Sequence, residues 1–369
     1  MYLERLSLAH FRNFNQTEQI SFPSGHLLIA AAPNATGKTN FLESMFVLLR
    51  GRSWRARTDE CVQWGAQGFV LQGEVHSGLG TAQLQVTYDI QQRTVRLEED
   101  QLPVSPVTLF TKYPVVTFFP EDTFIFSRGP EQRRNFLNQV LMSTPSYVAA
   151  LVQYYRVLKQ RNAALKNAGT FTDIAPWTEL LITHATTLIK YRRALALFLE
   201  NHVSDLYRDI SGEEQQFTVK LRTTGEEALL ASLEKNFNEE QRYGHTMSGP
   251  HRDDVVVTTA GHPVSSALSR GQIRSLVIAL KLAATNYLRQ TITEEPLVLL
   301  DDVLSELDEA RQEILLSHLP STGQILITCT HIPKTIQKRS DAHFLDLRAI
   351  LQPQHTVPIT EENEQPIRV

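Results

Sequence analysis

The chain has 369 residues, of which 42% are hydrophobic and 21% charged, with two cysteines and a formal net charge of −4. Its length allows about two domains with cores of their own, whereas no apolar run approaches the ~18 residues of a membrane span and the charged first residues are unlike a signal peptide. Cys61 and Cys329 predict a reducing cytoplasm rather than a disulfide framework or a cysteine-rich zinc site, and the net charge argues against a uniformly basic nucleic-acid-binding protein but not against a local basic face.

The first third of the chain has the pattern of strands around one strand–turn–helix unit. Alternating apolar residues predict strands over 2–14 and 19–22. A third strand begins at His26 and leads through a turn into a helix that runs toward Leu49. Further strands are expected at 69–75, 82–88, 94–97 and 115–119.

The turn after the strand at His26 predicts a phosphate-binding P-loop, because Gly-Lys-Thr opens an amphipathic helix there. Backbone N–H groups and the positive end of the helix would bind nucleotide phosphates. Lys38 would contact the β- and γ-phosphates, and the Thr39 hydroxyl would bind Mg²⁺. The nucleotide-binding residues expected from this loop are Asn34, Ala35, Thr36, Gly37, Lys38, Thr39 and Asn40.

Two alanines depart from the P-loop pattern. Ala32 replaces the first glycine of the motif, and Ala35 replaces a glycine that is common in such loops. Alanine in a left-handed conformation costs ~1–2 kcal/mol. Taken alone, the loop is equally compatible with a nucleotide site and with a chance strand–turn–helix.

Helical patterns dominate from Pro130 onward. Helices are expected over 131–141, 147–168, 177–209 and 226–242, with a short strand at 217–221. Neither a repeat nor a long heptad run is present, which favours a compact helical lobe over a coiled coil.

Two groups of basic residues are open to more than one interpretation. The four arginines around a tryptophan in 50–57 are compatible with contacts to phosphates, an adenine ring or DNA, and equally with a solvated loop. Solvated helix faces are the favoured explanation of a basic stripe in the helical segment, which comprises Arg156, Lys159, Arg161, Lys166, Lys190, Arg192 and Arg193.

The α/β pattern resumes in the last third. Strands are expected at 255–258, 296–302 and 323–331, helices from 273 to 289 and from Ser305, and a polar tail beyond Pro353. The strand of four apolar residues before Asp301 and Asp302 is typical of a buried parallel strand, and ligand sites lie at the carboxyl ends of such strands. Asp301 suits a Mg²⁺ shell shared with Thr39, and Asp302 suits polarisation of an attacking water. An acidic helix cap is the alternative.

The string Leu268-Ser-Arg-Gly-Gln272 resembles the LSGGQ signature of ABC-type ATPases, with Arg270 in place of one glycine. Ser269, Gly271 and Gln272 at a helix N-terminus would form an anion site. In ABC-type ATPases the signature caps the γ-phosphate bound to the partner subunit, so the resemblance implies ATP and a head-to-tail dimer. A plain N-cap is the alternative, and the spacing from the double Asp argues against it.

Several motifs spread over nearly the whole chain resemble the RecF family of bacterial recombinational repair, which are ABC/SMC-like ATPases. The most specific is Gly249-Pro-His-Arg-Asp-Asp254. The others are Phe11-Arg-Asn-Phe14, Gly37-Lys-Thr-Asn40, Gly51-Arg-Ser53, Pro120-Glu-Asp122, Gly129-Pro130 with Arg133-Arg134 and Phe136-Leu137, Leu158 with Gln160-Arg161-Asn162, Gly271-Gln272 with Arg274-Ser275, and Leu300-Asp-Asp302 with Glu306-Leu-Asp308. The departures are Ala32, Ala35 and Asn138, where the family usually has an acid.

The resemblance implies an α/β fold, an ABC/SMC P-loop ATPase head with an inserted compact α-helical lobe and no long coiled coil. The expected parts are residues 1–130 and 243–369 for the head and 131–242 for the lobe. An ATP-induced head-to-tail homodimer would bind double-stranded DNA near single-strand gaps, act with RecO and RecR to load RecA during repair, replication and the SOS response, and be reset by slow hydrolysis.

The resemblance also assigns roles to residues. Lys38 and Thr39 bind phosphate and Mg²⁺, Asp301 holds the metal shell and Asp302 assists the water. Ser269, Gly271 and Gln272 act in trans. Glu121 lies near the position of a glutamine that senses the metal and the γ-phosphate in ABC proteins, and the switch position falls on His331, Thr330 or Cys329.

Three alternatives remain at this stage. The altered P-loop is compatible with an ATP-gated DNA clamp that hydrolyses little or no ATP. An ABC transporter subunit is disfavoured by the double Asp in place of Asp-Glu-Pro and by the large helical insert. A small-molecule kinase with a P-loop leaves the signature unexplained.

Overall fold

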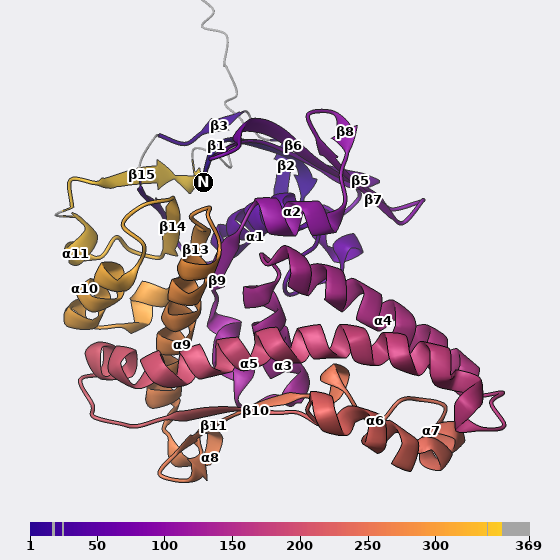
Figure 1. Ribbon diagram of the computed structural model, residues 1–369. Helices are drawn as coiled ribbons and strands as arrows, with labels where there is room; N and C mark the ends of the chain where they lie inside the picture. The colour runs from indigo at the N-terminus through magenta and orange to yellow at the C-terminus, as the bar shows by residue number, and fades with distance from the viewer. Residues whose placement is uncertain (17–18, 24–25, 338, 349–369) are drawn as a thin grey trace, which may run out of the picture.

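The computed structural model describes residues 1–16, 19–23, 26–337 and 339–348. Its centre is a parallel sheet of five strands in the order β15-β4-β14-β13-β9 (Figure 1). The strands are β4 (Leu27–Ala31), β9 (Val115–Phe118), β13 (Leu297–Asp301), β14 (Ile325–Cys329) and β15 (Ala342–Asp346). Every residue of β9, β13 and β14 is buried, which is the pattern of parallel strands covered on both faces.

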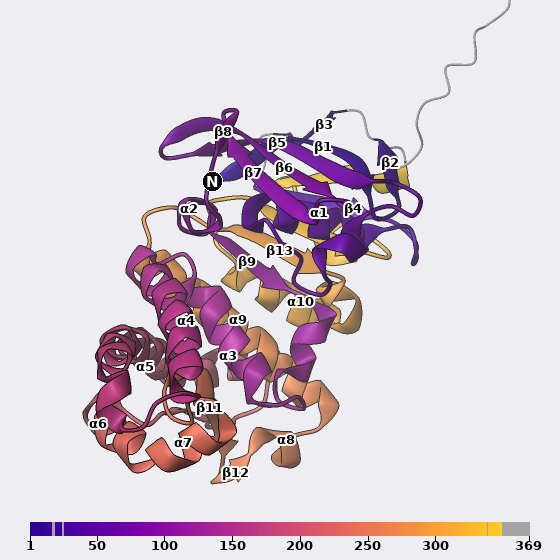
Figure 2. The same ribbon diagram turned by 90° about the vertical axis from the view of Figure 1, so that its right-hand side faces the viewer.

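Alternate residues of these strands enter two different cores, because successive side chains of a strand point to opposite faces. Leu27 and Ile29 of β4 face the helices, whereas Leu28 and Ala30 face a second, antiparallel sheet. Its strands are β1 (Tyr2–Phe11), β2 (Phe14–Gln16), β3 (Ile20–Ser21), β5 (Gly68–Ser77), β6 (Gly80–Asp89), β7 (Thr94–Glu99) and β8 (Leu102–Pro103). Helix α1 (Lys38–Arg50) lies between the two sheets and is buried along nearly its whole length (Figure 2).

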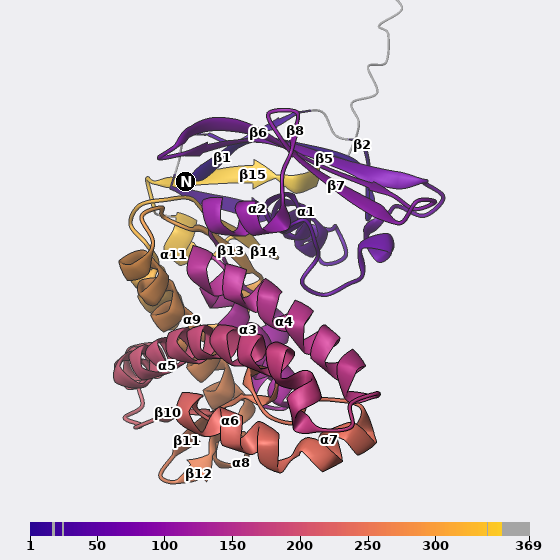
Figure 3. The ribbon, with the colours of Figure 1, turned by 45° about the vertical axis from the view of Figure 1, so that its right-hand side comes forward.

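The other face of the parallel sheet is covered by helices. The long helix α5 (Ala175–Ser211) packs against α4 (Pro145–Leu165) and α9 (Arg270–Thr291). Helix α4 extends away from the sheets, whereas α5 runs across the molecule beneath them (Figure 3). The remaining helices are α2 (Pro106–Lys112), α3 (Pro130–Leu141), α6 (Glu226–Lys235), α7 (Phe237–Tyr243), α8 (Val264–Ala267), α10 (Glu309–His318) and α11 (Lys334–Gln337). A small sheet of β10 (Thr218–Arg222), β11 (Asp254–Thr259) and β12 (His262–Pro263) lies beneath α5.

Five 3₁₀ turns complete the described chain: η1 (Thr58–Cys61), η2 (Pro120–Ile125), η3 (Phe171–Ile174), η4 (Pro250–Arg252) and η5 (Val303–Glu306). Between residues 1 and 348, apart from the gaps named above, no helix is both long and apolar enough to span a lipid bilayer.

The structure confirms most of the predicted elements and corrects several. The helix predicted over 226–242 is two helices, because Asn236 leaves the helical conformation between α6 and α7. The helix predicted from Ser305 begins at Glu309, capped by the Asp308 carboxylate. The prediction omitted α2, although Ser105 caps it and Pro106 follows, and also β2, β8, β12 and β15. The polar tail predicted beyond Pro353 lies outside the described residues.

The Gly249–Asp254 motif joins three helices. The Asp253 carboxylate pairs with Arg192 of α5 at 2.9 Å, and both side chains are 1% exposed. Asp254 accepts two hydrogen bonds from Arg133 of α3, at 2.7 and 3.1 Å. His251 lies 2.6 Å from the hydroxyl of Tyr154 of α4, and burial lowers the pKa of His251 to about 4. The neutral imidazole therefore accepts from Tyr154 and donates to the Thr246 carbonyl (2.9 Å).

The basic residues of the helical segment fall into two groups, one buried in ion pairs and one exposed to solvent. Arg161 pairs with Glu240 at 2.7 Å with both side chains fully buried, and Arg192 is buried with Asp253. Solvated faces were therefore the wrong explanation for these two arginines. The explanation holds for the exposed members, which are Arg156, Lys159, Lys166 and Lys190, and Arg193 is exposed beside Glu226.

Candidate nucleotide site

The predicted P-loop joins β4 to α1, and its conformation explains which glycine it retains. Gly37 has φ +103°, and a Cβ at this position would lie 2.5 Å from Nδ2 of Asn13. The left-handed backbone therefore favours glycine, and a Cβ would in addition displace the Asn13 side chain. Ala35 adopts φ +64°, whereas Ala32 has no positive φ and is 4% exposed. Of the two alanines that depart from the P-loop pattern, only Ala35 is strained.

This difference predicts opposite effects of two glycine substitutions. Ala35→Gly is expected to raise the free energy of unfolding by about 1 kcal/mol, because it relieves the left-handed strain at a smaller cost in unfolded-state entropy. Ala32→Gly is expected to lower it by ~0.5–1 kcal/mol, since it relieves no strain. Denaturant unfolding measures both. ATP affinity should be unchanged or higher in Ala35→Gly, and a marked fall would contradict this loop geometry.

Lys38 is the first residue of α1 and folds over the loop. Its ammonium donates to the carbonyls of Ala32 (2.8 Å) and Pro33 (3.2 Å) and to Oδ1 of Asn34 (3.3 Å). The side chain is 7% exposed, and all three acceptors are neutral. Among the described residues no carboxylate pairs with Lys38, so its charge remains available for an anionic ligand.

The two predicted metal-binding residues lie together. The Thr39 hydroxyl donates to Oδ2 of Asp301 at 2.6 Å, and the Thr328 hydroxyl donates to Oδ1 of the same carboxylate at 2.6 Å. Asp301 is 3% exposed at the end of β13. A hydroxyl and a carboxylate beside a phosphate-binding loop are the oxygen ligands that Mg²⁺ prefers, so the residues present fit this ion. Thr328 was not predicted, although it is the one hydroxyl residue of the buried strand β14.

Asp302 lies next to the loop in a strained conformation. Its φ is +51°, and such strain is concentrated at functional sites. The Thr330 hydroxyl lies 3.3 Å from Oδ1 of Asn34 and 3.5 Å from Oδ1 of Asp302. Of the three candidates for the switch position, Thr330 is the one with a side-chain hydrogen bond to Asp302, whereas Cys329 is 1% exposed in the core and His331 is exposed to solvent.

Glu121 is not brought into the site. Its side chain is exposed, whereas Asp122 lines a small hollow together with Asp301 and Asp302. The Asp122 carboxylate accepts from the backbone N–H of Phe119 (2.7 Å) and pairs with Lys281 of α9 (2.5 Å). These contacts direct the Asp122 side chain toward Asp301 and Asp302, and the Glu121 side chain faces solvent.

The signature residues lie at the start of α9, where Ser269 is the N-cap. The Ser269 N–H donates to the Gln272 side chain at 2.9 Å, the Gln272 N–H donates to the Ser269 hydroxyl at 3.3 Å, and Gln272 also donates to Glu213 (2.8 Å). Ser269 and Gly271 are exposed, and a Cβ on Gly271 would meet no atom within 4 Å. Within the described chain no hydrogen bond joins the signature residues to their own P-loop, as a role in trans requires.

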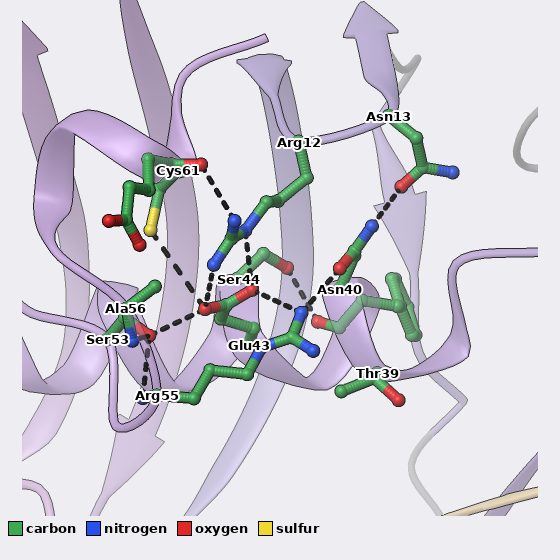
Figure 4. A network of polar contacts seen from close by, with 12 residues as sticks. Arg12, Asn13, Thr39, Asn40, Glu43, Ser44, Ser53, Arg55, Ala56 and Cys61 are labelled. Atoms are coloured by element: carbon green, nitrogen blue, oxygen red, sulfur yellow. Dashed lines mark hydrogen bonds and ion pairs between the residues drawn. The ribbon is translucent and has the colours of Figure 1, made fainter. Parts of the chain in front are cut away.

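A buried carboxylate on α1 organises the arginines beside the loop (Figure 4). Glu43 is fully buried and accepts from Arg12 (2.7 and 2.8 Å), Arg55 (2.8 Å) and Ser53 (2.5 Å). Burial alone raises the pKa of Glu43, but the hydrogen bonds from Arg12, Arg55 and Ser53 outweigh it, so that the pKa lies below the ordinary value. Glu43 therefore remains a carboxylate.

The same network reaches the first turn of α1. Asn40 donates to Asn13 at 2.7 Å and accepts from Arg55 at 2.5 Å. Sequence reasoning missed Glu43, although an acid within an otherwise apolar helical segment was a visible signal. The arginine-rich segment 50–57 is thus partly structural, since Arg55 is held by Glu43 and Asn40.

Comparison with known proteins places this chain in a family. A family model described as the RecF/RecN/SMC N terminal domain matches residues 2–344. The DNA replication and repair protein RecF of Geotalea daltonii is 34% identical over 346 residues, which cover 90% of this chain and 94% of that protein. The RecF protein of Moorella thermoacetica is 34% identical over 364 residues, covering 96% and 97%.

Solved structures give the same result for the fold. The recombination mediator protein RecF with ATP matches with a TM-score of 0.82 and 28% identity, over 90% of this chain and 93% of that one. An SMC head bound to the C-terminal winged-helix domain of ScpA matches with a TM-score of 0.53 and 13% identity, over 91% of each chain, and shares the fold. The predicted fold class, an α/β ATPase head of the SMC type, is confirmed.

Proposed function

We propose a function for this chain from its family, because the chain belongs to the RecF family of DNA replication and repair proteins. The chain binds ATP at the loop between β4 and α1 and acts in DNA repair and replication as an ATP-controlled, cytoplasmic DNA-binding protein. We assign residues 1–130 and 243–369 to the head, of which 349–369 lie outside the described residues, and residues 131–242 to the helical lobe.

The observation that carries the proposal is the contact between Thr39 and Asp301 beside the uncompensated charge of Lys38. The backbone of residues 34–40 and the Lys38 ammonium hold the phosphates. Mg²⁺, when bound by Thr39 and Asp301, supplies charge neutralisation at the phosphates. Asp302 orients the attacking water, since its carboxylate follows β13 directly at the edge of the loop.

Closure of the site requires a second copy of the chain. Ser269 and Gly271 are exposed, Gln272 is half-buried, and within the described chain none of the three forms a hydrogen bond with its own loop, so we assign them to the γ-phosphate held by the partner subunit. The resulting head-to-tail homodimer encloses double-stranded DNA near single-strand gaps and promotes RecA loading with RecO and RecR. Slow hydrolysis, stimulated by DNA, resets the dimer.

Light scattering with ATP, ADP or no nucleotide, with and without gapped DNA, tests the proposal. We expect a dimer with ATP only, and DNA retained only by the dimer. Ser269→Arg should leave ATP binding to the monomer intact but abolish dimer closure and DNA retention, because the added side chain occupies the surface that meets the partner's phosphate. Ser146→Arg, on the exposed start of α4, is the control. Equal loss of monomer ATP binding in Ser269→Arg would contradict the arrangement in trans.

A second candidate is a clamp that binds ATP but hydrolyses little or none of it. The strained Ala35 within the loop favours it, since relaxation of this strain would move the loop and with it the γ-phosphate relative to Asp302. Steady-state phosphate release with and without DNA distinguishes the two functions.

A further inference from the structure

A large cavity lies at the opposite end of α1 from the P-loop, where the head meets the helices. Its volume is about 670 Å³, a size typical of ligand sites. Residues from α1, β9, α3, α4 and α9 line it, and Figure 2 shows these elements grouped around the junction. We name it the arginine cavity, after Arg50 and Arg52 in its wall.

Two of the three cationic side chains that line this cavity have no counter-charge among the described residues. Its lining includes Arg50, Arg52 and Lys281, and among the described lining residues there is no Asp or Glu. Lys281 is accounted for by its pair with Asp122. The two arginines, by contrast, form no ion pair within the described chain.

Arg50 is the more deeply buried of the two, at 5% exposure. Its guanidinium donates to the carbonyls of Tyr113 (2.7 Å) and Val115 (3.5 Å). Burial, and then the neighbouring Arg52, lower the pKa of Arg50 to about 9, so the group is still charged at neutral pH. A buried charge without a counter-charge is costly, and an anion in the cavity removes that cost.

Arg52 is exposed and completes one wall. It lies 5.8 Å from the Phe110 ring, and Arg50 lies 5.6 Å from the same ring. Its one described hydrogen-bond partner is the weak acceptor Sδ of Met142, at 3.8 Å. Two guanidinium groups on one aromatic ring, with no carboxylate, form a site for phosphate, which arginine binds with several donors at once.

The rest of the cavity offers planar and amide groups. Tyr155 of α4 is 45% exposed, and Gln132, Asn135 and Gln139 of α3 line the same space. The indole N–H of Trp54, also in the lining, is buried without a hydrogen-bond partner among the described residues. Amides recognise the edge of a base, and aromatic rings stack on its face.

We propose that the arginine cavity binds a nucleotide unit, with its phosphate held by Arg50 and Arg52 and its base placed among Tyr155 and the amides of α3. This second nucleotide site is separate from the P-loop. The unit comes either from a free nucleotide or from an unpaired nucleotide of a DNA strand, and only the second source rests on the proposed function. A bound unit would also contact α9 through Ala284 and Leu288, and thus the helix that begins at the signature.

The test uses Trp54 as a built-in probe. Trp64→Phe combined with Trp177→Phe leaves Trp54 as the remaining one of the three tryptophans. In this background, fluorescence is titrated at constant ionic strength with inorganic phosphate, deoxyadenosine monophosphate, and a short single strand with and without a terminal phosphate. We expect a saturable change with the monophosphate or with the strand, and a rise in Tm with the same compound.

Two variants and one control identify the site. Arg52→Gln should weaken binding ~10-fold or more, since it removes a charged donor to phosphate, and its exposed position makes misfolding an inadequate explanation. Asn135→Ala should weaken the monophosphate but not inorganic phosphate. Arg57→Gln is the control, because Arg57 is exposed, pairs with Asp59 at 2.9 Å and does not line the cavity.

The outcomes separate the sources and the two proposals. Binding of the monophosphate alone supports a free nucleotide, and binding of the strand supports DNA. Absence of any saturable change, or equal affinity in Arg52→Gln, overturns the arginine cavity even where ATP-dependent DNA retention persists. Cavity binding in a protein that never retains DNA overturns the proposed function and leaves the cavity as a site for free nucleotide.

Discussion

Lys38→Ala is expected to abolish ATP-induced dimerisation. The Lys38 ammonium is the one described cation within the loop, held over it by three neutral oxygens at 2.8–3.3 Å, and phosphate is a stronger acceptor than any of them. Loss of such a charged contact costs ~2–4 kcal/mol, or ~30- to 1,000-fold in ATP affinity. Binding of a fluorescent ATP analogue and light scattering with ATP measure the two effects.

The matched control is Lys112→Ala. This substitution removes a lysine of α2 that pairs with Glu99 of β7. This variant should bind ATP and dimerise as the unsubstituted protein does. A thermal melt of Lys38→Ala without nucleotide separates loss of the phosphate contact from unfolding of the loop. Nucleotide-dependent dimers in folded Lys38→Ala would refute the assignment of the P-loop.

The second large effect is expected from Asp253→Ala, which should lower the free energy of unfolding by about 3 kcal/mol. Arg192 and Asp253 are each 1% exposed, and removal of one partner of a buried pair leaves an uncompensated charge, at a cost of ~3–5 kcal/mol. The lower end of the range applies because Arg192 keeps the Pro250 carbonyl (2.6 Å) and Oδ1 of Asn138 (3.0 Å). Denaturant unfolding measures the change.

A second substitution, at Asn138, tests whether the lost stability comes from the unpaired charge of Arg192. Its Oδ1 accepts from both Arg192 (3.0 Å) and Tyr147 (2.6 Å). Asn138→Asp should therefore restore a counter-charge and recover part of the stability lost in Asp253→Ala. Asp59→Ala breaks an exposed pair with Arg57 and should cost less than ~1 kcal/mol. A loss that small in Asp253→Ala would exclude the pair as a stabilising contact.

The contact between Thr39 and Asp301 was predictable because both residues follow apolar strands. The carboxyl ends of parallel strands meet at one edge of a sheet, so a hydroxyl on the helix after β4 and a carboxylate at the end of β13 converge there. The P-loop motif and the apolar strand pattern are visible in short stretches of sequence, and the geometry of a parallel sheet then brings the two residues together.

The pairing of buried charges was not predictable in this way. Periodicity places Arg161, Arg192 and Arg156 on helices alike, but only tertiary packing decides that the first two meet Glu240 and Asp253 while the third faces solvent. The wrong prediction for Glu121 has the same cause, because tertiary contacts decide which of two adjacent carboxylates faces the site. Asp122 contacts Phe119 and Lys281 and therefore faces inward, whereas Glu121 faces solvent.

The strand order of the parallel sheet determines when the nucleotide site forms during synthesis. Strand β4 has two neighbours, β14 and β15, and these come from residues 325–329 and 342–346. At ~5–20 residues per second the ribosome needs ~15–60 s after β4 to deliver them. A nascent chain that has reached residue 320 already contains the whole P-loop and α1, yet β4 has no strand to pair with. We therefore expect the polypeptide to acquire ATP binding late in translation, although the loop that we propose as the ATP site is among the first parts to be made.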